Sequence, residues 1–184
     1  STIPSTRFYN PYSLSFDGVN DFATGNVSVG STYTFTGWFK PNTDTFQTLA
    51  FFNASGSNGV LLRYNGSTTF EFFPNTSTSL VNITIPNISG TWAHVAMVHS
   101  GTAYSLYING TLVQSGTTVT PFVVGTTFRV GGCDGVWFLD GQARDVRIYS
   151  TVKTAGEIAT IYNQHIIPTT LDDVGLISRW WLNE

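Results

Sequence analysis

The stretch from Gly131 to Gly141 collects side chains that together could bind a sugar. Trp137 lies between Asp134 and Asp140, and glycine occupies four positions of the stretch. An aromatic face can stack on a pyranose, carboxylates can accept its hydroxyl groups, and glycine lets the backbone approach a ligand. We therefore predict a carbohydrate-binding site formed by Asp134, Trp137 and Asp140. The alternative is that Trp137 and Phe138 only close the edge of the fold.

Two further polar segments are predicted to lie at loop tips. Tyr64 is followed by Asn65-Gly66, and Asn58 ends a stretch rich in Ser, Asn and Gly. Because binding residues are concentrated on loops, Tyr64 and Asn58 are added to the predicted carbohydrate-binding residues. The alternative is that both segments are ordinary hairpin turns.

No catalytic site is predicted. Retaining glycosidases use two carboxyl groups about 5 to 5.5 Å apart, and the glutamates of this chain have no acidic neighbour from which such a pair could be assembled locally. The histidines also lack the spacing of zinc ligands. We therefore predict a protein that is not an enzyme. The three glutamates are Glu71, Glu157 and Glu184.

Charge and composition exclude two classes of partner. The net charge is -3, and the eight Lys and Arg residues are scattered, so we predict no nucleic-acid binding. No apolar run of about 18 residues occurs, so we predict no membrane insertion. Only 10% of the residues are charged. Thr, Ser, Asn and Gly supply the remaining polarity, which favours strands and turns over helices.

Short apolar and alternating runs recur about every ten residues, which predicts one all-β domain. From Trp92 to Val98 both alternating sets are apolar, as in a central strand that is buried on both faces. Asn109-Gly110 predicts a tight hairpin turn with positive φ at both residues. One helix is predicted near residues 154–163, with Thr154 as N-cap and Glu157 completing a capping box.

Several blocks, in this order, resemble the laminin-G-like domain of the concanavalin A-like lectin/glucanase superfamily, of the type found in phage fibre and decoration proteins. The resemblance implies a two-sheet antiparallel jelly-roll sandwich. The blocks are residues 14–22, 35–41, 92–96, 106–110 and 140–149, with Glu157-Ile158 behind them.

The same resemblance implies a calcium ion. Members of the family often hold calcium with carboxylates from the first and last blocks; the candidates here are Asp17 and Asp21 in the first block and Asp145, next to the family's usual position, in the last. Arg144 stands where the family usually has an Asp, so an ion pair between this guanidinium and Asp21 is one alternative to the metal. The other is that Asp17 and Asp21 only stabilise tight turns.

The predicted organisation is a sandwich over residues 1–165, a linker over 166–175 and a strand over 176–184. That strand either closes the sandwich or opens a following domain of a larger chain. A virion role would instead imply a homo-oligomer. The predicted function is a virion surface component that contacts other virion or surface proteins and has a cell-surface glycan as its ligand. The alternative is a carbohydrate-binding module of a secreted microbial adhesin or polysaccharide-degrading enzyme. Both place the domain on a virion or outside the cell.

Overall fold

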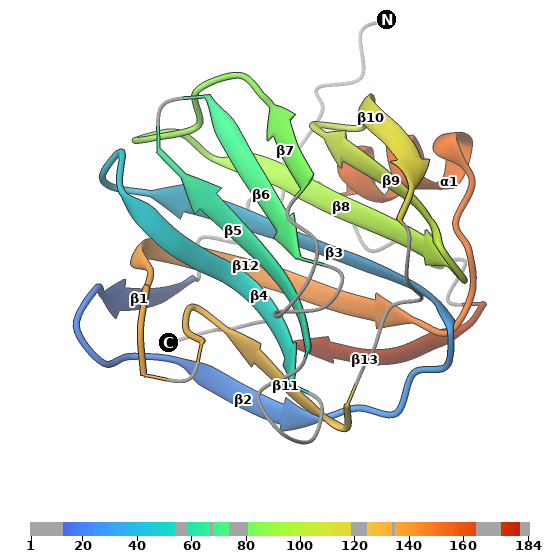
Figure 1. Cartoon of the computed structure of the whole chain (residues 1–184), viewed down its shortest axis with the longest axis horizontal. Coiled ribbons are helices and arrows are strands. Elements are labelled where there is room, and N and C mark those ends of the chain that lie inside the picture. The colour runs from blue at the N-terminus through green and yellow to red at the C-terminus, as the bar shows by residue number, and fades with distance from the viewer. Residues whose placement is uncertain are drawn as a thin grey trace, which may run out of the picture.

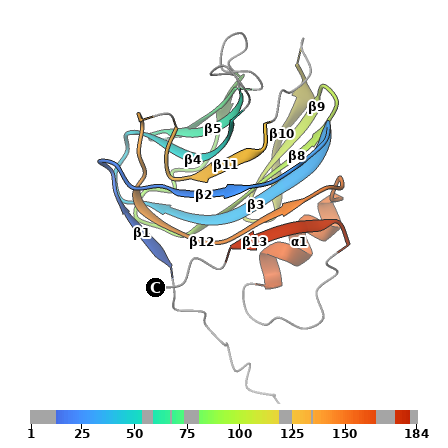
Figure 2. The ribbon, with the colours of Figure 1, turned by 90° about the horizontal axis from the view of Figure 1, so that it is seen from below.

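The computed structural model describes residues 13–53, 59–66, 68–73, 81–118, 125–133, 135–164 and 174–180. Two antiparallel sheets lie face to face in these residues, and one helix packs outside them (Figures 1 and 2). The predicted fold class is therefore confirmed.

The larger sheet has seven strands in the described residues, in the order β1-β12-β3-β8-β9-β10, with β13 also paired to β12. The smaller sheet has six, in the order β2-β11-β4-β5-β6-β7. The bounds in the seven-stranded sheet are β1 Leu14–Asp17, β3 Thr32–Pro41, β8 Ala93–Ser100, β9 Ala103–Ile108, β10 Thr111–Thr117, β12 Asp140–Tyr149 and β13 Leu176–Trp180. Those in the six-stranded sheet are β2 Ala23–Asn26, β4 Phe46–Asn53, β5 Gly59–Asn65, β6 Thr69–Phe73, β7 Val81–Thr84 and β11 Thr127–Val130.

The core lies between the two sheets and is mainly aromatic. Strand alternation directs Phe35 of β3 toward Phe52 of β4 and Phe128 of β11, and the Phe52 and Phe128 ring centroids are 4.7 Å apart. On β5 the even-numbered side chains join this core. Leu61 instead belongs to a separate cluster with Phe51 on the outer face of the six-stranded sheet. Arg63 is also directed to that outer face, because side chains two residues apart share a face.

Helix α1 (Ala155–Asn163) covers the outer face of the seven-stranded sheet (Figure 2). Ile158 and Ile161 pack against Ala96 and Val98 of β8, so β8 is buried on both faces, as predicted. Thr154 and Glu157 form the predicted capping box. Within the described part of the chain, no helix combines the length and the apolar character needed to span a membrane.

The predicted hairpin turn joins β9 to β10. Asn109 and Gly110 have φ values of 51° and 77°, and Ile108 pairs with Thr111. The Asn109 carboxamide oxygen also accepts a hydrogen bond from the backbone N–H of His94 at 2.9 Å. The turn is therefore confirmed, and it is tied to the neighbouring strand β8.

Strand β13 lies along the half of β12 that β1 leaves uncovered. β1 pairs with residues 140–143, whereas β13 pairs with residues 146–149. The indole of Trp180 stacks on Phe128 of the opposite sheet, with ring centroids 5.2 Å apart. In the described residues, this last segment therefore packs on the same sandwich and contacts both sheets.

Candidate functional site

The exposed tryptophan of the predicted sugar-binding loop lies over the outer face of the six-stranded sheet. The Arg63 guanidinium carbon is 4.2 Å from the ring centroid of Trp137, 4.7 Å from that of Phe46 and 5.0 Å from that of Phe73. Three rings from three segments thus surround one guanidinium. We call this surface, together with Glu71, the Trp137 face.

Backbone contacts hold Trp137 in place. Its carbonyl accepts a hydrogen bond from the N–H of Thr48 at 2.7 Å. The preceding tight turn is closed by mutual backbone hydrogen bonds between Cys133 and Val136, at 2.8 and 3.3 Å. Trp137 itself has a φ of 54°, which is uncommon for a bulky side chain. The residue nevertheless stays 42% exposed, so a strained, anchored backbone presents the tryptophan to solvent.

Arg63 and Glu71 form an ion pair beneath these rings. The two residues are 7% and 5% exposed, and they are direct partners on β5 and β6. Arg63 Nε donates to Glu71 Oε2 at 2.6 Å, and Arg63 Nη2 makes a second contact with the same oxygen. Asn65 Nδ2 donates to Glu71 Oε1 at 2.6 Å. Both carboxylate oxygens of Glu71 are therefore engaged by nitrogen donors.

Asp140 lies at the start of β12, three residues after Trp137, and is held by two amide side chains. Its backbone N–H donates to Gln47 Oε1 at 3.0 Å, and Asn42 Nδ2 donates to its Oδ1 at 2.9 Å. Gln47 is itself anchored by donation to the carbonyl of Thr43 at 2.8 Å. A carboxylate can accept about four hydrogen bonds, so half-buried Asp140 retains capacity to accept from a sugar hydroxyl.

Tyr64 does not lie at a loop tip, and that prediction is wrong. It is a β5 residue whose side chain is directed inward and is 0% exposed. Its hydroxyl donates to Asp44 Oδ1 at 2.7 Å, and burial together with this carboxylate raises its pKa. The strand continues to Asn65 and the turn follows at Gly66, because an apolar run placed Tyr64 in the core. Asn58 and Asp134 lie outside the described residues.

The prediction overlooked Arg63, Phe46 and Phe73. One signal for the ion pair was present in the sequence, since Arg63 and Glu71 are charged residues inside two apolar runs eight positions apart. A charge in a half-buried strand requires a partner, and a hairpin would bring these two together. The aromatic contacts depend on the path of the 131–139 segment, which the sequence pattern does not specify.

A sequence profile described as "Concanavalin A-like lectin/glucanases superfamily" matches residues 16–159. The chain belongs to this superfamily. No protein among the curated sequences matches it. Three solved structures of similar fold have sequences at most 20% identical to this chain, so their similarity establishes the fold alone.

A native heptameric SAP-like pentraxin from Limulus polyphemus has a TM-score of 0.71 and 16% identity, over 94% of this chain and 92% of that one. A putative carbohydrate binding protein from Bacteroides ovatus has a TM-score of 0.65 and 16% identity, over 94% of this chain and 53% of that one. Domain 4 of AbnA, a GH43 extracellular arabinanase from Geobacillus stearothermophilus, was solved in complex with arabinotriose. It has a TM-score of 0.60 and 20% identity, over 86% of this chain and 91% of that one.

The three predicted calcium ligands are not gathered at one place. The backbone N–H of Asp17 donates to Asp21 Oδ2 at 3.2 Å. Asp17 Oδ1 accepts from the N–H groups of Val19 and Asn20, which lower the pKa of Asp17. This is the turn-stabilising role considered as an alternative. The described residues contain no cluster of three or more carboxylate, His or Cys side chains suited to a metal ion.

Asp145 instead forms ion pairs with two arginines. Its Oδ2 accepts from Arg147 Nη2 at 2.6 Å, and its Oδ1 accepts from Arg179 Nε of β13 at 2.7 Å. Burial alone would raise the pKa of Asp145, but the two guanidiniums hold it below its usual value. Arg144 places its guanidinium carbon 4.4 Å from the Trp92 ring centroid and 5.4 Å from that of Trp38.

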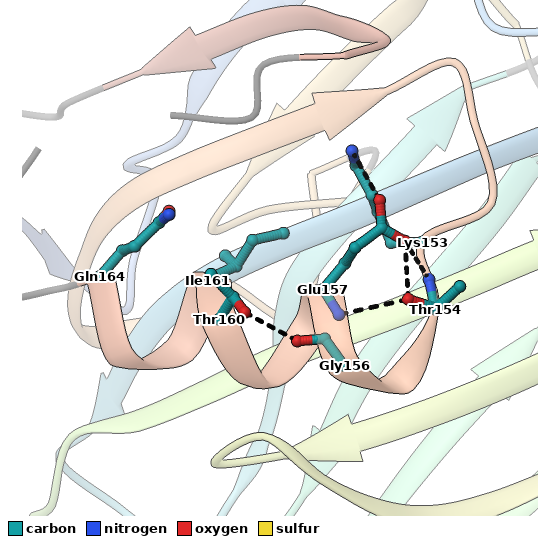
Figure 3. Close-up of a pocket in the computed structure, with 7 residues that line it drawn as sticks. All are labelled: Lys153, Thr154, Gly156, Glu157, Thr160, Ile161 and Gln164. Atoms are coloured by element: carbon teal, nitrogen blue, oxygen red, sulfur yellow. Dashed lines mark hydrogen bonds and ion pairs between the residues drawn. The ribbon is translucent and has the colours of Figure 1, made fainter. Parts of the chain in front are cut away.

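A pocket of about 250 Å³ lies beside α1 (Figure 3). Its charged side chains, Lys153 and Glu157, already have hydrogen-bond partners. Lys153 Nζ donates to Glu157 Oε1 at 3.4 Å and to the carbonyl of Val174 at 2.9 Å, while Glu157 caps the helix through Thr154. These contacts serve the helix terminus, so the Trp137 face is the stronger candidate site. The pocket is lined by Lys153, Thr154, Gly156, Glu157, Thr160, Ile161 and Gln164.

Proposed function

We propose that this domain is a non-catalytic carbohydrate-binding module and that its glycan stacks on the exposed side of Trp137. The observation that carries the proposal is the 42% exposure of Trp137, whose backbone has a φ of 54° and whose ring lies over a buried guanidinium. Strained backbone persists where the surrounding structure enforces it, and it is concentrated at ligand sites. An exposed, immobilised aromatic ring loses little side-chain entropy when a ligand binds.

The chemistry around the ring suits a sugar. The C–H face of a pyranose can pack on the indole, and Asp140 can accept from an equatorial hydroxyl. Phe46, which is also largely exposed, extends the apolar platform on the other side of Arg63. The proposal is further supported by two proteins of similar fold, one described as a putative carbohydrate binding protein and one solved with arabinotriose.

The non-catalytic part of the proposal is supported by the state of the carboxylates. Glu71 is buried and paired with Arg63, and Glu157 is engaged in capping α1. A general acid or a nucleophile must reach the substrate, whereas Glu71 is buried beneath the rings and Glu157 caps a helix on the other sheet. Binding without hydrolysis is the function that this arrangement supports.

We further propose that the module is displayed on a virion or on a secreted protein. The low charged fraction of 10% and the resemblance of residues 14–22 to phage virion domains support this location. A virion component is expected to form a closed symmetric oligomer, whereas a module of a secreted enzyme is usually monomeric. Light scattering coupled to size exclusion distinguishes the two, and a monomer at high micromolar concentration would argue against the virion role.

A glycan array tests the binding function. We expect saturable binding by the unmodified domain and at least about a fivefold loss of affinity for Trp137→Ala, because stacking of a nucleobase on an aromatic ring, the analogue used here, contributes about 1 to 3 kcal/mol. Leu112→Ala is the matched control, since Leu112 is similarly exposed but lies on β10 of the other sheet. Unchanged binding by Trp137→Ala would refute the proposed site.

A further inference from the structure

We infer that the Arg63 guanidinium supplies the positive charge beneath the Trp137 face that a metal ion would otherwise supply, so that glycan binding there needs no calcium. The inference rests on the proposed function and specifies how that same site is organised. It assigns Arg63 as a positioning residue, which acts on the ligand through the indole ring.

The first step concerns the positive charge at the centre of the site. The Arg63 guanidinium carbon lies 4.2 to 5.0 Å from three ring centroids, within the distance at which a cation attracts the face of an aromatic ring. One side of the Trp137 indole is therefore bound to a cation that the chain itself supplies. The 42% exposure of Trp137 leaves part of the residue open to a sugar.

The second step concerns the carboxylates that a calcium ion would need. Calcium takes six to eight oxygen ligands. At the Trp137 face, both oxygens of Glu71 already accept from Arg63 and Asn65. Three residues after Trp137, the Asp140 carboxylate accepts from Asn42 Nδ2, and the Asp140 backbone N–H donates to Gln47 Oε1. Nitrogen donors thus orient these carboxylates as a metal would, and the described residues contain no group of three or more carboxylate, His or Cys side chains to hold one.

The third step concerns what Arg63 does for the ligand. The left-handed backbone at Trp137 is uncommon for this residue type, so contacts must hold the ring where it is. The backbone of Trp137 is fixed by Thr48, and its ring lies over the Arg63 guanidinium. A planar guanidinium can stack on an indole while its edge binds a carboxylate, and Arg63 makes both contacts. Loss of the guanidinium would leave the ring free to reorient.

The test is a titration of the domain with the glycan that binds most tightly on the array. It is done in about 5 mM calcium and again in excess chelator. Equal affinities in both buffers are expected. Binding that is lost in chelator would overturn this inference and leave the proposed function standing. Absence of binding in both buffers would overturn the proposed function, and the inference with it.

Variants test the role of Arg63. Arg63→Met combined with Glu71→Gln removes the ion pair without leaving a buried charge, and we expect about a tenfold loss of affinity because the cation–π contact is absent. Arg63→Lys keeps a cation but lacks the planar fork that stacks and pairs at once, so its affinity should lie between those of the unmodified domain and the double variant. Thermal melting verifies that each variant is folded. Affinity unchanged in a folded double variant would overturn the positioning role.

Discussion

His99 is buried against Tyr33, with ring centroids 4.8 Å apart. Burial lowers the pKa of His99 to about 4, opposed only in part by its hydrogen bond with the carbonyl of Gly101. In the unfolded chain the pKa returns to 6.5, so the unfolded state binds the proton first as the pH falls. Stability should therefore be unaffected by His99 above pH 6.5 and should decline between pH 6.5 and 4.

The expected loss over that interval is about 3 kcal/mol, since each pKa unit corresponds to about 1.4 kcal/mol. Urea denaturation at several pH values measures it. His99→Gln retains a donor for Gly101 but does not titrate, so its stability should be nearly flat across the same interval. An equally steep decline in the variant would assign the pH dependence to other groups.

Single residues of the site were predictable where composition carried the signal. Trp137 and Asp140 were chosen because they stand in a glycine-rich stretch; the structure places Trp137 over Arg63, and Asp140 beside Asn42 and Gln47. Tyr64 was misplaced because its Asn-Gly neighbours resemble a turn, whereas burial of the preceding apolar run decided its position. Arg63 was overlooked because a cation–π contact depends on a loop path that no local pattern specifies.

At the scale of elements, the Thr154 cap on α1 has a measurable contribution. The backbone N–H of Glu157 donates to Thr154 Oγ1 at 3.3 Å, and the Glu157 carboxylate accepts from the Thr154 N–H at 2.6 Å. Thr154→Ala should lower the free energy of unfolding by about 1 kcal/mol. Chemical denaturation measures the change.

Thr160 supplies the matched control, because it lies on the same helix and its hydroxyl donates to the carbonyl of Gly156 at 2.9 Å. Alanine is the better helix former, so Thr160→Ala should be neutral or slightly stabilising. Equal losses in the two variants would contradict a specific capping role.

Elements whose conformation is set by residues close together in the sequence could be predicted in detail. The Asn109-Gly110 turn requires positive φ at both residues, the capping box fixes where α1 begins, and the two apolar faces of residues 92–98 indicate a strand covered on both sides. The position of β13 could not be predicted in this way. Its pairing with β12 depends on the edge that β1 leaves open and on Asp145, which lies 34 positions away from Arg179.

At the scale of the whole molecule, Trp180 of β13 joins the two sheets. The Trp180 ring stacks on Phe128. It also lies close to Gly25, where an added Cβ would be 3.0 Å from the ring atom Cζ2. Trp180→Ala should destabilise the domain by about 2 to 3 kcal/mol, because the half-buried ring packs against both sheets. Thermal or urea unfolding measures this, with the more exposed Ile177→Ala on the same strand as control. A loss no larger than that of the control would contradict the bridging role.

The central claim is that a glycan binds at the Trp137 face, and an NMR titration with an array-selected glycan tests it most directly. The indole N–H resonance of Trp137 and the amides of Asp140 and Phe46 should shift in a saturable way. The indole of Trp92, which lies by Arg144 on the other sheet, should not move. Saturable shifts confined to Trp92 or to α1, with Trp137 unperturbed, would contradict the account.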